Sequence, residues 1–365
     1  MTIDLEVDTT KQPDRDDDDK DALLVVDNLT VTFPTDDGDV KAVRGVSYTV
    51  RAGESVGIVG ESGSGKSVSS LAVMGLLPKT ARISGSVRFR GEELLGLDED
   101  EYAKLRGNRI AMIFQDPLTS LNPVYTVGYQ IAEAVLAHNN VSRDKARQRA
   151  IELLGIVGIP FPEQRVDSYP HELSGGMRQR VVIAIAMTND PDVIIADEPT
   201  TALDVTVQAQ VLEALEAARD ATGAALVLIT HDLGVIAGHA QRICVMYAGK
   251  LVETGTTEDV FYRPRMPYTL GLLGSLPRMD QKRQERLTPI KGSPPSLLNL
   301  PPGCPFTPRC PIAEDICDRD EPDLELVAGT GHAAACHFRN RTANVEAADI
   351  FTDEPATAAG GEVAP

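Results

Sequence analysis

The sequence predicts an α/β protein, in which a mostly parallel sheet carries a glycine-rich loop. We expect an antiparallel β region ahead of this sheet and a helical insertion within it. Three observations lead to this fold class. A short apolar run at 54–60 passes through glycines into a helical pattern, and apolar strands alternate with helices from 175 to 230. After 262, proline and charge dominate, which indicates a small, loop-rich C-terminal module.

The elements follow in order along the chain. Apolar stretches and turn residues alternate over 22–50, which is typical of antiparallel strands. Apolar spacing over 116–170 is helical and marks the insertion. The remaining predictions are a buried strand at 54–60, a helix at 67–77, a strand pair at 84–95, a strand at 109–114, a helix at 175–188, a strand at 193–196, a helix at 205–222 and a strand at 225–230.

Length and charge limit the possible functions. The chain has 365 residues, 42% of them hydrophobic, and a net charge of −19, which argues against non-specific binding to nucleic acid. Its amino terminus is acidic, unlike a signal peptide, and no apolar run approaches the roughly 20 residues that span a bilayer. We therefore expect a protein kept in the cytosol, where thiols stay reduced.

Much of the acidity lies at the two ends of the chain. Residues 1–21 and 343–365 are rich in acidic residues and are predicted to be disordered tails. The run DDDDK at 16–20 resembles an engineered protease site, although a natural acidic tail is the simpler interpretation. Between the tails we expect a main domain at 22–262 and the C-terminal module at 263–342.

The stretch GESGSGKS at 60–67 predicts a phosphate site. It matches G-x-x-x-x-G-K-[ST] and lies between a predicted strand and a predicted helix, which is the context that this motif requires. Glycines let backbone N–H groups surround phosphate oxygens, and the helix amino terminus adds positive potential. Lys66 would bridge the β- and γ-phosphates of ATP, and Ser67 would bind Mg²⁺. The whole loop is the predicted binding segment: Gly60, Glu61, Ser62, Gly63, Ser64, Gly65, Lys66 and Ser67.

A second predicted strand ends in two carboxylates. In DVIIADEP at 192–199, Asp197 lies at the strand end, where it could bind Mg²⁺. Glu198 follows and could act as a general base on the attacking water. The alternative interpretation is an exposed acidic turn after a core strand. The presence of the predicted phosphate loop in the same chain argues against this alternative.

Three further features are weak alone and gain meaning from their order. LSGGM at 173–177 is a turn that opens a helix, and it offers a second backbone anion site. Gln115 and His231 each follow a predicted strand. A single polar residue after a strand is usually structural, so these assignments depend on the whole set of motifs.

Taken together, residues 22–262 resemble the nucleotide-binding subunits of ABC transporters, which are P-loop NTPases. GESGSGKS resembles the Walker A loop, Gln115 the Q-loop glutamine and LSGGM the signature. VIIADE resembles the Walker B strand with its catalytic glutamate. ALD, which ends in Asp204, resembles the D-loop, and His231 resembles the switch histidine. Phe33 is a weaker match to the aromatic residue that stacks on adenine.

The resemblance implies a shared site. Two such domains form a head-to-tail dimer, and each ATP lies between the Walker A loop of one chain and Ser174, Gly175 and Gly176 of the other. It also implies that Mg²⁺ contacts Ser67, Gln115 and Asp197. One chain alone would then be a poor ATPase, and closure and reopening of the dimer would drive a membrane partner.

FQDPLTSLNPVYTVGYQIAEA at 114–134 resembles the ATPase subunits of dipeptide and oligopeptide importers and their nickel-importing relatives. In that family the region contacts the permease, although an exposed loop is the plain alternative. RPRMPYT at 263–269 resembles the His-Pro-Tyr element of the same subfamily, with Met266 in place of the histidine. The implied partners are two permease subunits, a second, homologous ATPase that forms a heterodimer, and an extracytoplasmic substrate-binding protein. The chain would then lie at the cytoplasmic face of the membrane.

Four of the five cysteines lie near the end of the chain, at Cys304, Cys310, Cys317 and Cys336. A tight C-x₂₋₄-C pair, typical of structural zinc sites, is missing, while two of the four are followed by proline. This spacing and the subfamily resemblance favour a [4Fe–4S] cluster that stabilises a module with little core. Zinc and unligated or disulfide-forming thiols remain alternatives, and Cys244 is interpreted as a small buried apolar residue.

The sequence thus predicts the ATP-hydrolysing subunit of a peptide-type ABC importer. A nickel or other small-solute importer of the same family is one alternative. A soluble ABC ATPase of translation or DNA repair is another, but such proteins usually carry two nucleotide domains or a long coiled-coil insert, and neither is found in this sequence.

Overall fold

The structure, a computed structural model, describes residues 21–201, 203–276, 289–343, 345 and 347–351. The strands are β1 (Ala22–Thr35), β2 (Gly38–Arg51), β3 (Ser55–Val59), β4 (Arg82–Phe89), β5 (Glu92–Glu93), β6 (Ile110–Ile113), β7 (Val193–Asp197), β8 (Ala225–Thr230), β9 (Arg242–Tyr247), β10 (Lys250–Thr256), β11 (Glu325–Leu326) and β12 (Ala333–Ala334). The helices are α2 (Lys66–Val73), α3 (Glu99–Leu105), α4 (Pro117–Ser120), α5 (Val127–His138), α6 (Arg143–Ile156), α7 (Pro162–Arg165), α8 (Gly175–Ala186), α9 (Val205–Thr222), α10 (Leu233–Ile236), α11 (Thr257–Tyr262), α12 (Pro267–Gly274), α13 (Asp315–Arg319) and α14 (Ala347–Ile350), with two 3₁₀ turns, η1 (Pro170–Glu172) and η2 (Thr307–Arg309).

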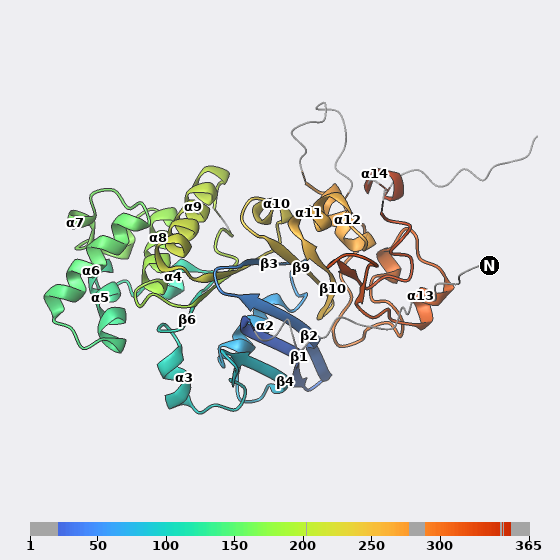
Figure 1. Cartoon of the computed structure of the whole chain (residues 1–365), viewed down its shortest axis with the longest axis horizontal. Helices are drawn as coiled ribbons and strands as arrows, with labels where there is room; N and C mark the ends of the chain where they lie inside the picture. The colour runs from blue at the N-terminus through green and yellow to red at the C-terminus, as the bar shows by residue number, and fades with distance from the viewer. Residues whose placement is uncertain (1–20, 202, 277–288, 344, 346, 352–365) are drawn as a thin grey trace, which may run out of the picture.

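Two sheets organise the described residues. The main sheet has the strand order β11-β12-β10-β9-β3-β8-β7-β6, and a smaller sheet has the order β2-β1-β4-β5. The molecule is elongated, with the helices α5 to α7 at one end, the C-terminal module at the other and the sheets between them (Figure 1). The α/β architecture with an antiparallel part and a helical insertion is therefore the one that the sequence predicted.

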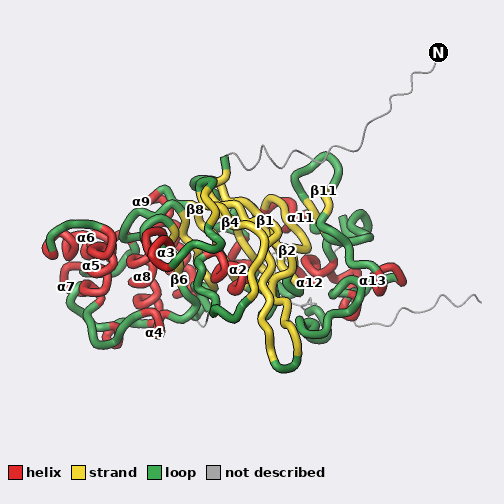
Figure 2. The backbone as a smooth tube through the Cα atoms, turned by 90° about the horizontal axis from the view of Figure 1, so that it is seen from below, coloured by secondary structure: helices red, strands yellow, loops and turns green. Residues whose placement is uncertain are grey.

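The smaller sheet is the antiparallel region expected at 22–50. β1 pairs with β2 from Thr35 opposite Gly38 near the turn to Ala22 opposite Arg51 at the far end, and β4 pairs with the other edge of β1. Figure 2 shows the two long strands side by side, running to a hairpin at their tip. Leu24 and Val31 are fully buried and belong to the core between the two sheets.

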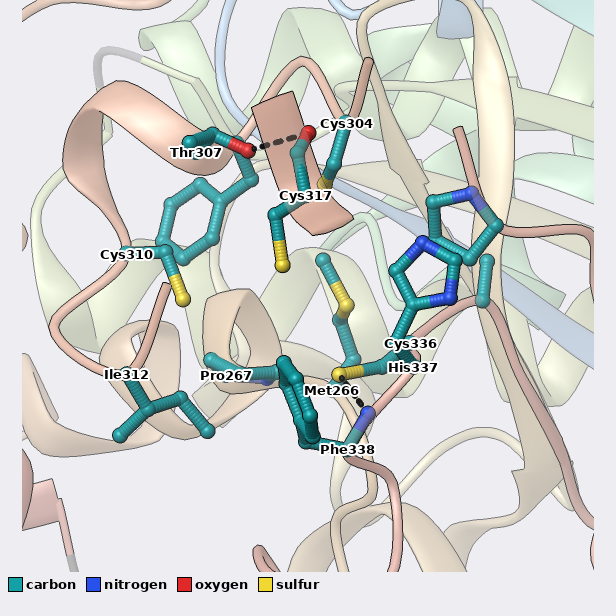
Figure 3. A pocket seen from close by; sticks show the side chains of 13 residues that line it. Met266, Pro267, Cys304, Thr307, Cys310, Ile312, Cys317, Cys336, His337 and Phe338 are labelled. Carbon is teal, nitrogen blue, oxygen red and sulfur yellow. Dashed lines mark hydrogen bonds between the residues drawn. The ribbon is translucent and has the colours of Figure 1, made fainter. Parts of the chain in front are cut away.

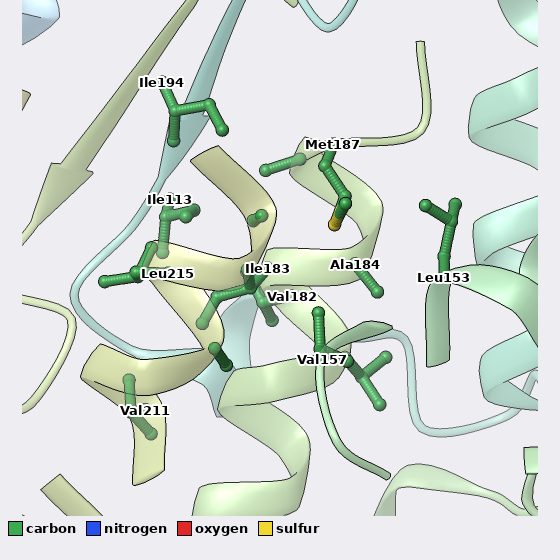
Figure 4. Close-up of a cluster of buried hydrophobic side chains, with 14 of the residues drawn as sticks. Ile113, Leu153, Val157, Val182, Ile183, Ala184, Met187, Ile194, Val211 and Leu215 are labelled. Atoms are coloured by element: carbon green, nitrogen blue, oxygen red, sulfur yellow. The ribbon is translucent and has the colours of Figure 1, made fainter. Parts of the chain in front are cut away.

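The centre of the main sheet is parallel, in the order β9-β3-β8-β7-β6. Its side chains alternate between two cores. Ile195 and Val227 face the core under the smaller sheet, whereas Ile194 and Leu226 face the core that includes α8 and α9. Because both faces are covered, these strands have continuous apolar runs. Figure 4 shows part of the second core, where sheet residues meet helix residues such as Ile183.

The helical insertion predicted at 116–170 contains α4, α5, α6 and α7. Ser142 and Thr126 begin α6 and α5 as N-caps, each accepting a hydrogen bond from a backbone N–H one turn ahead. Buried Leu153 and Leu154 of α6 pack into the same core as α8. The insertion is thus attached to the main sheet through α8, and its own polar face points outward.

Helix α2 is shorter than predicted. The sequence predicted a helix at 67–77, but α2 ends at Val73. Gly75 has φ = 61°, in the left-handed region that often ends helices, and its N–H bonds back to Ala72 O at 3.1 Å. The apolar spacing continued past the true end, because residues after the turn still face the core.

The sequence predicted a separate C-terminal module from residue 263. In the structure this module packs against the main domain. Its strand β12 pairs with β10 and extends the main sheet, with Ala334 opposite Glu253. Its apolar side chains, including fully buried Phe306, join a third core together with β9 residues. A segment with few apolar residues cannot form a core of its own, so it buries them against the domain.

A buried polar group connects the module to β10. Glu253 is 0% exposed, and its carboxylate accepts hydrogen bonds from the N–H groups of Arg265 at 2.5 Å and Met266 at 3.2 Å. Its Oε1 also lies 2.7 Å from Nε2 of His332, the residue just before β12. Every described partner of this carboxylate therefore belongs to the segment after 262.

The sequence predicted a disordered acidic tail from residue 343, but the segment begins with the short helix α14. α14 packs near α12, and Ala347 is buried. Phe351 joins the third core. Residues 1–20 and 352–365 lie outside the described residues. None of the described helices has the length and apolar character needed to cross a membrane.

The first prediction concerns the connection at Glu253. Replacing Glu253 by Ala leaves His332 and two backbone N–H groups buried without their acceptor, so we expect a loss of about 3 kcal/mol in the free energy of unfolding. Chemical denaturation of the full chain measures this. The matched control is Glu325→Ala, which removes an exposed carboxylate of the same module and should cost less than about 0.5 kcal/mol. Equal stability of the two variants would contradict the prediction.

Candidate active site

The glycine-rich loop lies between β3 and α2, as predicted. Close packing explains two of its glycines. A Cβ atom at Gly60 would lie 2.2 Å from Met246 O, and one at Gly65, where φ is 102°, would lie 2.4 Å from Ala42 O. No side chain fits at either position, so the loop closes tightly against β2 and β9. Ser64 Oγ is buried in this loop without a hydrogen-bond partner among the described residues, as expected of a group that binds an added ligand.

Lys66 opens α2 and folds back over the loop. Its Nζ donates hydrogen bonds to Gly60 O at 2.7 Å and Glu61 O at 3.0 Å, and lies 4.0 Å from Oε1 of Glu198. Burial lowers the pKa of Lys66, and the nearby carboxylates of Glu198 and Asp197 act in the opposite direction. A buried ammonium group at the loop is suited to bind phosphate.

Ser67 and Asp197 meet beside this lysine. Ser67 Oγ donates a hydrogen bond to Oδ1 of Asp197 at 3.0 Å, and Asp197 is 6% exposed at the end of β7. Burial raises the pKa of Asp197, while the Ser67 hydrogen bond lowers it. A hydroxyl and a carboxylate close together are the oxygen ligands that Mg²⁺ prefers, so these residues fit the ion that the sequence predicted here.

Glu198 is the centre of the site. Its φ is 46°, which is unusual for a residue with a side chain, and its N–H donates to Ile229 O at 2.8 Å. Its Oε2 accepts hydrogen bonds from Gln115 Nε2 at 3.1 Å and from Thr201 Oγ1 at 2.8 Å. Nδ1 of His231 lies 3.3 Å from the same oxygen. The structure thus brings three predicted residues, Glu198, Gln115 and His231, into one group.

Thr201 is the one member of this group that sequence reasoning missed. It follows the Walker B-like strand by a tight turn, in which its N–H donates to Glu198 O at 3.2 Å. A hydroxyl three residues after a carboxylate is the pattern of an ordinary turn, so the sequence offered no specific signal.

The remaining predicted residues lie elsewhere. Ser174 caps α8 by accepting a hydrogen bond from Met177 N, and Asp204 caps α9. The two caps are close to each other, since a Cβ at Gly176 would lie 2.3 Å from Val207 Cγ1. α8 and α9 belong to the helical side of the molecule, whereas α2 lies under the smaller sheet (Figures 1 and 2). Phe33 is half-buried on β1 and packs against the core there.

The four C-terminal cysteines line one pocket, together with Met266 and Phe306. In Figure 3 the sulfur atoms of Cys310, Cys317 and Cys336 point toward the space between them. Burial raises the pKa of Cys310 to about 12 and that of Cys336 to about 11, which favours protonated thiols. Among the described residues, no group of three or more His, Cys, Asp or Glu side chains is arranged to hold a metal ion.

Comparison with known proteins agrees with this geometry. Residues 43–201 match the family model "ABC transporter", and residues 252–317 match "Oligopeptide/dipeptide transporter, C-terminal region". The fold also resembles a solved dimeric ATP-binding cassette in a post-hydrolysis state bound to ADP and Pi. The TM-score is 0.57 at 29% identity, over 64% of this chain and 98% of that one.

Curated relatives are more similar. The oligopeptide transport ATP-binding protein OppD of Mycobacterium tuberculosis is 57% identical over 90% of this chain, which spans 54% of that relative. The dipeptide transport ATP-binding protein DppD of Bacillus subtilis is 51% identical over 88% of this chain and 96% of its own length. The chain therefore belongs to the ABC transporter family, in which these curated relatives are named for oligopeptide and dipeptide transport.

Proposed function

We propose that this chain hydrolyses ATP and thereby drives peptide import through a membrane permease. The observation that carries the proposal is the position of Glu198. Its carboxylate lies among Gln115, His231 and Thr201, beside the lysine of the phosphate loop. A partly buried carboxylate that several donors hold in place next to a phosphate site is positioned to accept a proton from water.

The residues divide the chemistry of hydrolysis among them. The oxygen of water forms a bond to the γ-phosphorus, the bond to the bridging oxygen breaks, and ADP and phosphate are released. Glu198 accepts the proton of the water, and Lys66 stabilises negative charge on the phosphate oxygens. Mg²⁺, when bound by Ser67, Asp197 and Gln115, supplies further neutralisation of phosphate charge. His231, through its contact with Glu198, orients the carboxylate.

The predicted site residues that lie away from Glu198 suggest a partner chain. Ser174–Gly176 and Asp204 lie on the helical side, and we propose that they complete the ATP site of a second ATPase chain in a head-to-tail heterodimer. Two permease subunits and an extracytoplasmic substrate-binding protein complete the proposed importer, which places this chain at the cytoplasmic face of the membrane. Peptide is the proposed cargo, because the curated relatives are named for oligopeptide and dipeptide transport.

We also propose that Cys304, Cys310, Cys317 and Cys336 bind a [4Fe–4S] cluster. The support is that all four line a single pocket and that four thiols are the usual ligand set of such clusters. Ligation would require the thiols to lose their protons and to move closer together than the described arrangement, in which no metal-binding group is formed.

Glu198→Gln tests the chemistry. The amide keeps the shape of the side chain but cannot accept the proton, so turnover in the assembled complex should fall by about 100-fold or more. Binding of ATP should persist, because Lys66 and the loop are unchanged. Steady-state phosphate release and nucleotide binding measure the two quantities. Glu213→Gln, an exposed carboxylate on α9, is the control. Wild-type turnover in Glu198→Gln would refute the general-base assignment.

Addition of the second ATPase chain tests the shared site. The purified chain alone should hydrolyse ATP slowly, and the specific activity should rise as the second ATPase chain is added, because two chains must meet to complete each site. Analytical ultracentrifugation beside the activity assay identifies the active species. Fast hydrolysis by a species shown to be monomeric would exclude the shared site.

Anaerobic purification tests the cluster. Four thiolate ligands predict about four irons and four sulfides per chain and a brown protein. Cys310→Ser should lose the iron and the colour, whereas Cys244→Ala, a buried cysteine outside the pocket, should retain both. Metal and sulfide analysis of the purified protein measures both quantities. Stoichiometric zinc without sulfide would refute the assignment of a [4Fe–4S] cluster.

A further inference from the structure

An ion pair joins the C-terminal module to the phosphate loop. Arg309, the last residue of η2, forms a two-pronged contact with Glu61, the second residue of the loop, at 2.6 Å and 2.8 Å. The Arg309 side chain is only 4% exposed. It also donates to Tyr247 Oη at 3.3 Å and to Lys291 O at 3.1 Å, so its position is fixed by several partners.

Glu61 is held at its backbone as well. Its N–H donates to Tyr268 Oη at 2.8 Å, and Tyr268 is fully buried on α12. Its carbonyl accepts a hydrogen bond from Lys66, the phosphate-binding lysine. Two residues from beyond 262 therefore determine where Glu61 lies, and Glu61 in turn contacts Lys66.

A second series of contacts connects the module to the same loop at Ser64. Glu321 of the module pairs with Arg44 at 2.7 Å and with Lys250 at 3.0 Å. The backbone N–H of Arg44 donates to Gly249 O, and the N–H of Gly249 donates to Ser64 O at 2.9 Å. The module thus influences the loop near both Glu61 and Ser64.

Charge explains why Arg309 matters for the nucleotide. The Glu61 side chain is 28% exposed beside a loop that binds phosphate, and the Glu61 carbonyl accepts a hydrogen bond from Lys66 Nζ at 3.0 Å. An unpaired carboxylate there would repel a triphosphate and compete with it for the lysine. The guanidinium of Arg309 compensates this charge, because it hydrogen-bonds both carboxylate oxygens of Glu61.

We propose that Arg309 is a positioning residue of the nucleotide site. It neutralises Glu61 and fixes the start of the phosphate loop, so the C-terminal module forms part of the ATP-binding machinery. This inference relies on the proposed function, because it takes the loop to bind ATP.

The test compares ATP affinity in four variants of the full chain: Arg309→Gln, Glu61→Gln, the double variant and Arg341→Gln. Arg341 is the matched control, since it forms an exposed ion pair with Glu314 in the same module and does not reach the loop. A fluorescent ATP analogue and the matching ADP analogue, both with Mg²⁺, report the Kd. Steady-state kinetics of the assembled complex report KM and kcat.

Arg309→Gln should raise the Kd for the ATP analogue about tenfold, which corresponds to about 1.4 kcal/mol, and the Kd for the ADP analogue by less. The double variant should regain most of the lost affinity, because the unpaired carboxylate is gone, and Glu61→Gln alone should bind ATP somewhat more tightly. In the complex the loss should appear in KM rather than in kcat. Arg341→Gln should bind like wild type.

Two results would overturn the inference while leaving the proposed function intact. One is an unchanged Kd in Arg309→Gln. The other is a double variant as weak as Arg309→Gln, which would mean that only packing was lost. Failure of the wild-type chain to bind ATP would instead remove the proposed function, and this inference with it.

Discussion

The parallel arrangement of the central strands is the constraint on which the site depends. Neighbouring parallel strands must be joined by crossovers, so the carboxyl ends of β3, β7 and β8 all emerge at one edge of the sheet. The phosphate loop follows β3, Glu198 follows β7 and His231 follows β8. Residues more than a hundred positions apart therefore meet, and burial on both faces of the sheet keeps the strand ends in place.

This edge gathers negative charge at a site for an anionic ligand. Glu61, Asp197 and Glu198 all lie near Lys66, and each has a specific partner. Asp197 is bonded to Ser67 and Glu198 to Gln115 and Thr201, while Glu61 is paired with Arg309. Three carboxylates can lie together at a partly buried site only when each is paired or hydrogen-bonded.

The C-terminal module supplies one of these charge partners because it packs against the main domain, having too few apolar residues for a core of its own. The ring centroids of its aromatic residues Tyr268 and Phe306 lie 4.5 Å and 5.4 Å from that of Tyr247 on β9. That packing places Arg309, next to Phe306 in space, beside the phosphate loop. The same burial that stabilises a core-poor segment thus brings the guanidinium of Arg309 to the glycine-rich loop.

The sequence by itself determined the local parts: the strand, the glycine loop and the start of the helix at 54–67, the strand that leads into Asp197 and Glu198, and the helical insertion. Short motifs and apolar periodicity encode these features, and both act over a few residues. The group formed by Glu198, Gln115 and His231 could be anticipated only through family resemblance. The contact of Arg309 with Glu61 joins residues 248 positions apart, and the role of Thr201 depends on one strained turn. Only the tertiary structure decided these contacts, because the partner of a buried charge is set by how distant segments pack, and no local pattern records that.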